Sequence, residues 1–115
     1  MRHIEDYSAP LIGEFEQLVL LSLLRLGNGA YGAAIRRDIE ERTTREVGIG
    51  TLYMTLGRLE EKRMICSYVG NPTQQRGGRR RKHYLMEDLG QRALGRAYRT
   101  LQSMSEGLEQ QLANL

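Results

Sequence analysis

Two strand-like runs on either side of a glycine-rich segment restrict the fold of this chain more than any other feature. The runs MICSYV (64–69) and RKHYLM (81–86) contain the apolar and aromatic residues typical of strands, and GNPTQQRGG (70–78) has the composition of a loop. We therefore predict an antiparallel β-hairpin. Residues 76–82 include five basic residues and no acidic residue, so the end of the hairpin carries a local positive charge.

Three helices are predicted before this hairpin. Apolar residues with helical spacing extend over residues 11–26, where a glycine-containing turn follows. A second, shorter helix is expected over about residues 31–42, and a third over about residues 49–62. The third helix is predicted from three leucines at helical spacing, Leu52, Leu56 and Leu59.

The last part of the chain, residues 88–115, is predicted to form one continuous helix, with Asp88 and Gln91 as a capping pair. Its apolar residues, spaced by threes and fours, are Ala93, Ala97, Leu101, Met104, Leu108, Leu112 and Leu115. Such a helix would be about 40 Å long, longer than so small a domain covers. The stripe therefore indicates a dimer seam in preference to packing within one chain, and it suggests two parts, residues 1–87 and 88–115.

The composition is that of a single globular domain. The chain has 115 residues, of which 40% are hydrophobic and 27% charged, and its net charge is +3. The single cysteine, Cys66, excludes an intramolecular disulfide and is interpreted as a half-buried filler in preference to a redox sensor. The run LVLLSLLRL (18–26) is too short to cross a membrane, and the N-terminus lacks the pattern of a secretion signal. We therefore expect a cytoplasmic protein.

No pattern of a catalytic or metal site is found in the sequence. His3 and His83 are far apart and have no cysteine or carboxylate partners at ligand spacing, and Glu14 and Glu16 are interpreted as solvated charges. The sequence therefore predicts neither an enzyme nor a bound cofactor or metal.

The third predicted helix has two different faces. When residues advance by about 100 degrees each, Leu52, Leu56 and Leu59 fall on one side. The opposite side is short and polar and contains Gly50, Thr51, Met54, Gly57 and Arg58, with Thr55 at its edge. Small side chains allow a helix to approach the DNA major groove closely, and an arginine pairs well with guanine. The alternative interpretation is an ordinary solvated helix face.

The order of the elements favours the DNA-binding interpretation. Three helices followed by a basic hairpin are typical of a winged helix-turn-helix, in which the third helix lies in the groove and the hairpin reaches phosphates or the minor groove. The predicted fold class is therefore mainly α with a small β-hairpin, a winged helix-turn-helix domain plus a long C-terminal dimerisation helix.

Three blocks of sequence, in the expected order, resemble the PadR family of transcriptional regulators. They are AYG (30–32), GTLY with the following LGRLE (50–53 and 56–60), and the segment from RGGR to Tyr84 (76–84). The resemblance spans about residues 13–94. It implies a dimeric winged-helix repressor, in which the C-terminal helix and parts of the first helix form the dimer.

The predicted functional residues form a DNA-binding set and a dimerisation set. Within the DNA-binding set, the exposed side of the third helix contributes the base contacts, whereas the resemblance places Tyr31 near the phosphate backbone and three arginines in the wing. The predicted DNA-binding residues are Tyr31, Thr51, Tyr53, Met54, Thr55, Arg58, Arg76, Arg79 and Arg80. The predicted dimerisation residues are Phe15, Leu18, Ala97, Leu101, Met104, Leu108 and Leu112. Arg81 and Lys82 are left open between DNA contacts and solvent-facing strand residues.

The sequence departs from the PadR pattern at four positions. Gly48 stands where a serine cap is usual, at a cost of only about a few tenths of a kcal/mol, and Arg63 stands where a glycine closes the recognition helix. His83 and Leu85 replace an aromatic and a basic residue on the second wing strand. These changes do not remove the predicted DNA-binding features, but they leave the orientation of the wing undetermined by the sequence.

Two functions are compatible with the sequence. The favoured one is a sequence-specific regulator that binds double-stranded DNA as a homodimeric repressor, and the alternative is a winged-helix adaptor that binds a protein. Strong salt dependence of the affinity for duplex DNA distinguishes the two. The resemblance also implies a small-molecule effector site between the first and the C-terminal helices. The candidate residues for this site are Phe15, Leu18, Ser22, Leu101 and Met104. The favoured interpretation of the same residues is that they form the core of the dimer.

Overall fold

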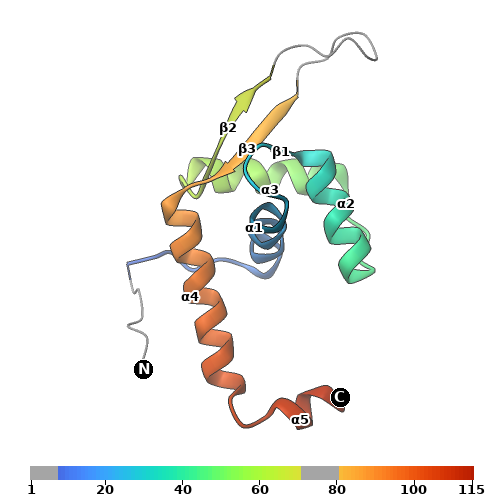
Figure 1. Cartoon of the computed structure of the whole chain (residues 1–115), viewed down its shortest axis with the longest axis vertical. Helices are drawn as coiled ribbons and strands as arrows, with labels where there is room; N and C mark the ends of the chain where they lie inside the picture. The colour runs from blue at the N-terminus through green and yellow to red at the C-terminus, as the bar shows by residue number, and fades with distance from the viewer. Residues whose placement is uncertain (1–7, 71–80) are drawn as a thin grey trace.

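A computed structural model describes residues 8–70 and 81–115 (Figure 1). The elements in these residues are α1 (Glu14–Leu26), β1 (Ala30–Tyr31), α2 (Gly32–Thr43), α3 (Ile49–Glu61), β2 (Ile65–Val69), β3 (Lys82–Met86), α4 (Asp88–Ser105) and α5 (Glu109–Ala113). Helices α2 and α3 and both hairpin strands begin and end within one residue of the predicted bounds. The mainly helical architecture with a small antiparallel sheet confirms the mainly α part of the predicted fold class, whereas the dimerisation role of the C-terminal helix stays a prediction.

Helix α1 begins at Glu14, later than the predicted start at residue 11, because Gly13 and Glu16 form its N-terminal cap. The Gly13 N–H donates to Glu16 Oε1 at 2.8 Å, which satisfies a backbone donor that has no partner inside the helix. Lys62 Nζ lies 3.3 Å from Glu16 Oε2 and ties this end of α1 to α3. Burial raises the pKa of Glu16, but hydrogen bonds from Gly13 and Lys62 outweigh it and hold the pKa below its ordinary value. Leu11 therefore precedes the helix and is 77% exposed.

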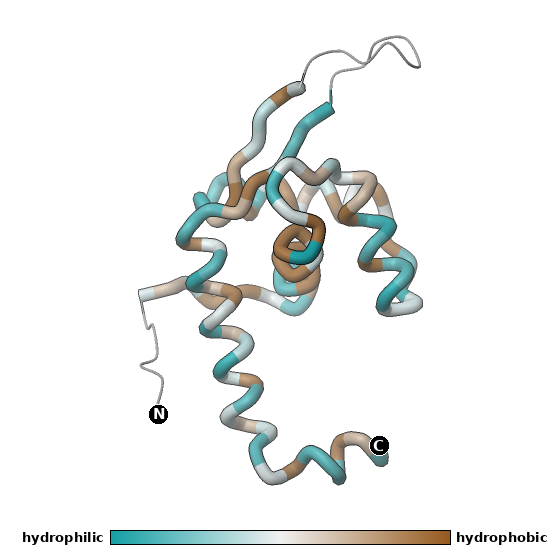
Figure 2. The backbone as a smooth tube through the Cα atoms, viewed as in Figure 1, coloured by the Kyte–Doolittle hydropathy of each residue, from teal (hydrophilic) through white to brown (hydrophobic). Residues whose placement is uncertain are grey.

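The hydrophobic core surrounds α1, which contacts α2, α3, α4 and β3. Figure 2 shows α1 as a largely apolar coil in the middle of the molecule, as expected for a helix buried on several sides. The apolar side chains that are at most 1% exposed are Val19, Leu20, Leu23, Ile35, Leu52, Leu56, Leu59, Met64, Ile65 and Ala93. Since Ala93 and Leu94 belong to this core, the first half of α4 packs together with the preceding elements.

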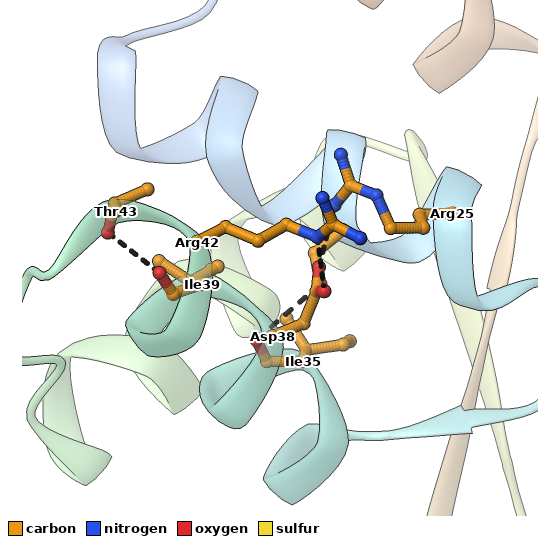
Figure 3. A network of polar contacts seen from close by, with 7 residues as sticks. Arg25, Ile35, Asp38, Ile39, Arg42 and Thr43 are labelled. Atoms are coloured by element: carbon orange, nitrogen blue, oxygen red, sulfur yellow. Dashed lines mark hydrogen bonds and ion pairs between the residues drawn. The ribbon is translucent and has the colours of Figure 1, made fainter.

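Charged side chains also join α1 to α2 (Figure 3). Asp38 of α2 binds Arg25 of α1 through Oδ2 and Arg42 of α2 through Oδ1, at 2.8 Å and 3.0 Å. Burial raises the pKa of Asp38, but hydrogen bonds from Ser22, Arg42 and Arg25 outweigh it and hold the pKa below its ordinary value. The buried Ser22 Oγ also lies 3.5 Å from the Ile35 carbonyl oxygen. Ser22, a predicted effector contact, is therefore part of the packing between α1 and α2.

The predicted hairpin belongs to a larger antiparallel sheet, which in the described residues has three strands in the order β1–β3–β2. In β1, Ala30 pairs with Tyr84 and Tyr31 pairs with His83. Gly29, with φ 95°, leads into this strand, and its N–H donates to the Tyr84 carbonyl at 2.8 Å. Tyr31, which was predicted to open the second helix, is the N-cap of α2 and also the last residue of β1, a strand that was not predicted. A two-residue strand is too short to show a period in the sequence.

A tight turn leads from α3 into β2. Arg63 has a left-handed backbone with φ 63°, a conformation that glycine adopts without steric cost. The Met64 N–H donates to the Leu59 carbonyl at 2.9 Å, and the Glu87 N–H donates to the Met64 carbonyl at 3.0 Å. Arg63 thus lies beyond the helix in a turn that these backbone bonds hold in place.

The prediction of one continuous C-terminal helix is wrong. Helix α4 ends at Ser105, and a turn at Gly107, with φ 85°, separates it from the short α5 (Figure 1). The Leu108 N–H closes this turn on the Ser105 carbonyl at 2.9 Å. Because a glycine in the left-handed region ends a helix, α4 is about 27 Å long in place of about 40 Å. Its N-cap is Glu87, without a side-chain cap hydrogen bond, so the predicted capping by Asp88 is also wrong.

None of the helices in the described residues has the length and apolar composition needed to span a membrane. Within residues 8–70 and 81–115, no group of three or more His, Cys, Asp and Glu side chains is arranged to hold a metal ion.

Candidate nucleic-acid interface

Helix α3 buries one face and exposes the opposite face, as the leucine spacing predicts. Leu52, Leu56 and Leu59 are at most 1% exposed. The exposed residues on the other side are Gly50, Thr51, Tyr53, Met54, Gly57 and Arg58. Met54 is 63% exposed. This face therefore presents small groups together with one thioether and one guanidinium.

Thr55, predicted at the edge of this face as a base contact, is buried. Its side chain is 1% exposed, and its Oγ1 accepts a hydrogen bond from Arg58 Nη2 at 3.4 Å. The buried arc of α3 is wider than the leucines indicate, because α3 packs against α1, α2 and β2. Thr55 falls within this arc, so the prediction that it contacts a base is wrong.

Gly50 and Gly57 leave the exposed face of α3 without projecting side chains at two positions. A Cβ added at either position would meet no atom within 4 Å, so the packing of the chain does not require glycine there. A glycine inside a helix lowers its stability by about 1 kcal/mol relative to alanine. The two glycines therefore destabilise α3 without an internal steric reason, and they allow another molecule to approach the helix closely.

Tyr53 brings α3 against the start of α2. A Cβ added at Gly32 would lie 2.7 Å from the Tyr53 hydroxyl, so a larger residue there would displace the Tyr53 ring from this contact. Tyr31 directly precedes Gly32 and is the N-cap of α2. The structure therefore brings together Tyr31 and Tyr53, two of the predicted DNA contacts, where α2, α3 and the sheet meet.

An aromatic cluster that the sequence patterns did not predict lies on the outer face of the sheet. The His83 ring is stacked on Tyr68, with 4.6 Å between ring centroids and 3° between ring planes, and it is tilted against Tyr31 at 4.6 Å. The Arg81 guanidinium lies 4.9 Å from the centroid of the Tyr31 ring. The alternation of strand residues between faces could have indicated part of this cluster, because it places residues 81 and 83 on the same face of the second hairpin strand.

Tyr84 points to the opposite side of the sheet from His83. It is 3% exposed and belongs to the core. Burial raises the pKa of Tyr84 to about 12, and the nearby Tyr53 and Glu60 act in the same direction. Because successive strand residues alternate between faces, Tyr84 anchors β3 on the core while its neighbour His83 faces outward.

The predicted wing contacts Arg76, Arg79 and Arg80 lie outside the described residues, so their roles stay predictions. The described strand pairing extends to both sides of this segment, where the Gly70 N–H donates to the Arg81 carbonyl at 2.9 Å. The basic segment therefore connects the paired ends of β2 and β3.

Comparison with known proteins identifies the family to which this arrangement belongs. The model of the transcriptional regulator PadR-like family matches residues 20–96, which include α2, α3, the sheet and the start of α4. This chain belongs to the PadR-like family. The resemblance found in the sequence is thereby confirmed.

Solved structures share the fold of this PadR-like chain. A PadR family transcription regulator from Clostridium difficile R20291 has a TM-score of 0.67 and 28% identity, over 85% of this chain and 98% of that chain. A PadR family transcriptional regulator from Eggerthella lenta DSM 2243 has a TM-score of 0.66 and 28% identity, over 86% of each chain. F93 from STIV, a winged-helix DNA-binding protein, has a TM-score of 0.67 but 12% identity over 85% and 98% of the two chains, so it shows the fold alone. No curated protein matches this sequence.

The residues predicted for dimerisation of this PadR-like chain lie in different environments. Phe15 and Leu18 are partly buried against the core. On α4, Ala97 is half-buried, whereas Leu101 and Met104 are 66% and 74% exposed. The apolar surface of the second half of α4 is therefore not covered within one chain.

Leu108 and Leu112 were predicted to continue the same stripe. They are 43% and 48% exposed, and they lie beyond the turn at Gly107. Because that turn separates α4 from α5, the prediction of one straight seam from Leu101 to Leu112 is wrong.

A groove of about 270 Å³ lies between the segment 10–12 and α4 of the PadR-like chain. Its lining includes Leu11, Ile12, Ala97, Leu101 and Met104. Of the residues predicted for an effector site, Leu101 and Met104 line this groove, whereas Phe15, Leu18 and Ser22 are not part of its lining.

Cys66 on β2 is half-buried, as expected for a packing residue. A hydrogen bond with Glu87 raises the pKa of the Cys66 thiol, and burial and the charge of Glu60 act in the same direction. A thiol with a raised pKa stays protonated and is a weak nucleophile, which disfavours a redox role.

Proposed function

We propose that this PadR-like protein is a homodimeric repressor that binds a specific sequence of double-stranded DNA. The observation that carries the proposal is the open face of α3, where Gly50 and Gly57 lie beside the exposed Met54 and Arg58. A helix with such a face enters the major groove without steric obstruction.

In this proposal the bases are contacted by Thr51, Met54 and Arg58, all of which are exposed on α3. Arg58 forms a bidentate pair with guanine, Met54 contacts a thymine methyl group, and Thr51 hydrogen-bonds to a base edge or a phosphate. The buried Thr55 is left out of this set.

The phosphate backbone is held by tyrosines at the junction of α2 and α3 and by the wing. Tyr53 is 47% exposed at the flank of the recognition helix, which suits a phosphate contact better than a base contact. The complete proposed set consists of Tyr31, Tyr53, Arg76, Arg79 and Arg80. Such contacts supply affinity that does not depend on sequence and orient the recognition helix.

The dimer is proposed to form through α4 and the groove beside it. Leu11, Leu101 and Met104 are 77%, 66% and 74% exposed, and contiguous apolar surface of this kind favours a second copy of the chain. The dimer also sets the distance between the recognition helices, which must meet half-sites about 34 Å apart. A small-molecule effector that occupied this groove in place of the partner copy would relieve repression.

The first test is fluorescence anisotropy across a salt series, with a duplex from the region upstream of the protein's own gene and a scrambled duplex of equal length. We expect tighter, salt-sensitive binding to the upstream duplex, because specific binding adds base contacts to phosphate contacts. Absence of binding to either duplex at low salt would favour the protein-binding adaptor instead.

The Arg58→Ala variant tests the base contacts directly. It is expected to reduce discrimination between the two duplexes by about 1–3 kcal/mol. Arg37→Ala removes the same charge from the exposed surface of α2 and serves as the control. Unchanged discrimination by a folded, dimeric Arg58→Ala protein would contradict the proposal.

A further inference from the structure

Four side chains form a continuous series of contacts on the outer face of the sheet. The Arg81 guanidinium lies 4.9 Å from the Tyr31 ring centroid, and the His83 ring lies 4.6 Å from the rings of both Tyr31 and Tyr68. Tyr31, His83 and Tyr68 are direct cross-strand partners on β1, β3 and β2. One layer of rings therefore crosses the described sheet and ends with a guanidinium.

The His83 ring is held at two of its edges. Its Nδ1 lies 3.0 Å from the Gly29 carbonyl, so this nitrogen carries the proton and donates to the carbonyl oxygen. Its Nε2 faces Gly70, where an added Cβ would come within 2.4 Å. Gly29 precedes β1 and Gly70 follows β2. The ring is therefore fixed between the two outer strands.

This layer links Arg81 to α3 through Tyr31 and its neighbour Gly32. Tyr31, against which Arg81 packs, directly precedes Gly32, and Gly32 lies against the Tyr53 hydroxyl. Tyr53 belongs to α3 and is 47% exposed. A cation at the loop end of the hairpin is thus linked, through Tyr31 and the adjoining Gly32, to the helix proposed to enter the major groove.

The stacking of Arg81 prepares its guanidinium for a phosphate. A guanidinium stacks through its flat face, while its N–H donors lie in its plane and point outward. Arg81 is exposed, and phosphate oxygens accept such donors in pairs. A side chain that is already held by a ring also loses less conformational freedom when it binds.

We propose that Arg81 contacts a backbone phosphate of bound DNA, and that His83 is the positioning residue that holds Tyr31 and, through it, Arg81. This inference rests on the proposed DNA-binding function. It assigns a role to Arg81, which the sequence left open, and to His83, for which the sequence indicated no catalytic or metal-binding role.

Lys82 offers a matched control within the same chain. It is adjacent to Arg81, carries the same charge and is exposed. Because strand residues alternate between faces, Lys82 lies on the opposite face of β3 from His83.

The experiment measures the salt dependence of duplex affinity by fluorescence anisotropy. Each phosphate contact contributes about −0.9 to the slope of log K against log salt. Arg81→Ala is expected to make this slope shallower by about 1 and to weaken binding about tenfold, whereas Lys82→Ala leaves the slope unchanged.

Three substitutions at His83 separate positioning from direct contact. His83→Ala is expected to make the slope of log K against log salt shallower by about 1, as in Arg81→Ala, because Tyr31 loses its ring neighbour. His83→Phe keeps a stacked ring without a charge and is expected to restore the slope of the wild-type protein. His83→Asn keeps a donor to the Gly29 carbonyl without the ring and is expected to behave like His83→Ala. Thermal unfolding followed by circular dichroism shows that each variant is folded.

Equal slopes for Arg81→Ala and Lys82→Ala would overturn the inference, and so would a His83→Phe protein as impaired as His83→Ala. Both the upstream and the scrambled duplex are used. A phosphate contact does not depend on sequence, so the slope reports on Arg81 even if the protein binds both duplexes equally. Equal binding to the two duplexes would contradict only the proposed sequence specificity. Absence of binding to any duplex would overturn both proposals.

Discussion

At the scale of single residues, Arg63 shows that a turn can keep a backbone conformation that its side chain disfavours. A left-handed backbone costs an L-residue about 1–2 kcal/mol, yet Arg63 has φ 63°. The backbone bond from Met64 to the Leu59 carbonyl, at 2.9 Å, closes the turn around it. The conformation is therefore imposed by the connection between α3 and β2.

The Arg63→Gly variant is expected to be more stable than the wild-type protein. Glycine removes the steric cost of the left-handed backbone but loses more conformational freedom on folding, so the net gain in the free energy of unfolding is about 0.5–1 kcal/mol. Urea denaturation measures this change. Glu61→Gly, in the last turn of α3, is the control and should lower stability, because helical backbone favours other residues over glycine. A loss of stability in Arg63→Gly would contradict the argument.

At the scale of elements, Gly57 illustrates a conflict between the stability of α3 and its proposed use. Gly57→Ala is expected to raise the free energy of unfolding by about 1 kcal/mol, because the added methyl group meets no atom of the chain and alanine favours helix. The same methyl group stands on the face proposed to enter the major groove, so the affinity for DNA should fall. Urea denaturation and anisotropy measure the two effects.

Gly90→Ala is the control for this prediction. Its Cβ would lie 2.2 Å from the Met64 carbonyl oxygen, so it should destabilise the fold in spite of the helical preference of alanine. An increase of both stability and DNA affinity in Gly57→Ala would contradict the proposed role of the open face.

The ion pairs between α1 and α2 predict a defined pH dependence. The pKa of Asp38 is lowered in the folded chain, so its carboxylate contributes stability above the ordinary aspartate pKa, and this stability is lost as the pH falls through the lower folded value. Asp38→Asn should lower the free energy of unfolding by about 1–3 kcal/mol at pH 7, and the difference from the wild-type protein should shrink below about pH 4. Urea denaturation at several pH values measures both.

Glu14 provides the matched control for Asp38. Its carboxylate also binds an arginine, Arg45, at 2.7 Å, but its side chain is 75% exposed, in contrast to 12% for Asp38. Glu14→Gln should therefore change stability by less than about 0.5 kcal/mol. Similar losses in the two variants would show that burial does not distinguish these ion pairs.

At the scale of the whole molecule, the exposed apolar end of α4 predicts how the protein assembles. Replacing both Leu101 and Met104 by Glu should convert a dimer into a monomer, because charges would enter the proposed apolar contact. The variant should fold, since both side chains are largely exposed in the single chain. Sedimentation velocity measures the assembly, and Ser103→Glu, on the opposite side of α4, is the control. A double variant that stays dimeric would place the interface elsewhere.

Hydrophobic spacing and glycine positions were sufficient to predict α2, α3 and both hairpin strands closely, because these signals are local. The errors occurred where a helix cap, a glycine turn or tertiary packing outweighed the spacing of apolar residues. The Gly13–Glu16 cap shortened α1, and Gly107 interrupted a stripe whose period otherwise continues. Thr55 was misplaced because α3 is covered on more sides than its leucines alone indicate.

Local patterns along this chain were thus enough to predict the order of its elements and the exposed face of α3, and three blocks of sequence were enough to indicate the PadR-like family. The tertiary structure alone decided which side chains meet on the outer face of the sheet. His83 bonds to the carbonyl of a residue 54 positions earlier, and its ring is stacked on Tyr68 of β2 and tilted against Tyr31 of β1. Such contacts depend on strand register and on the turn at Gly29, and no periodicity within a single segment encodes how distant segments pair.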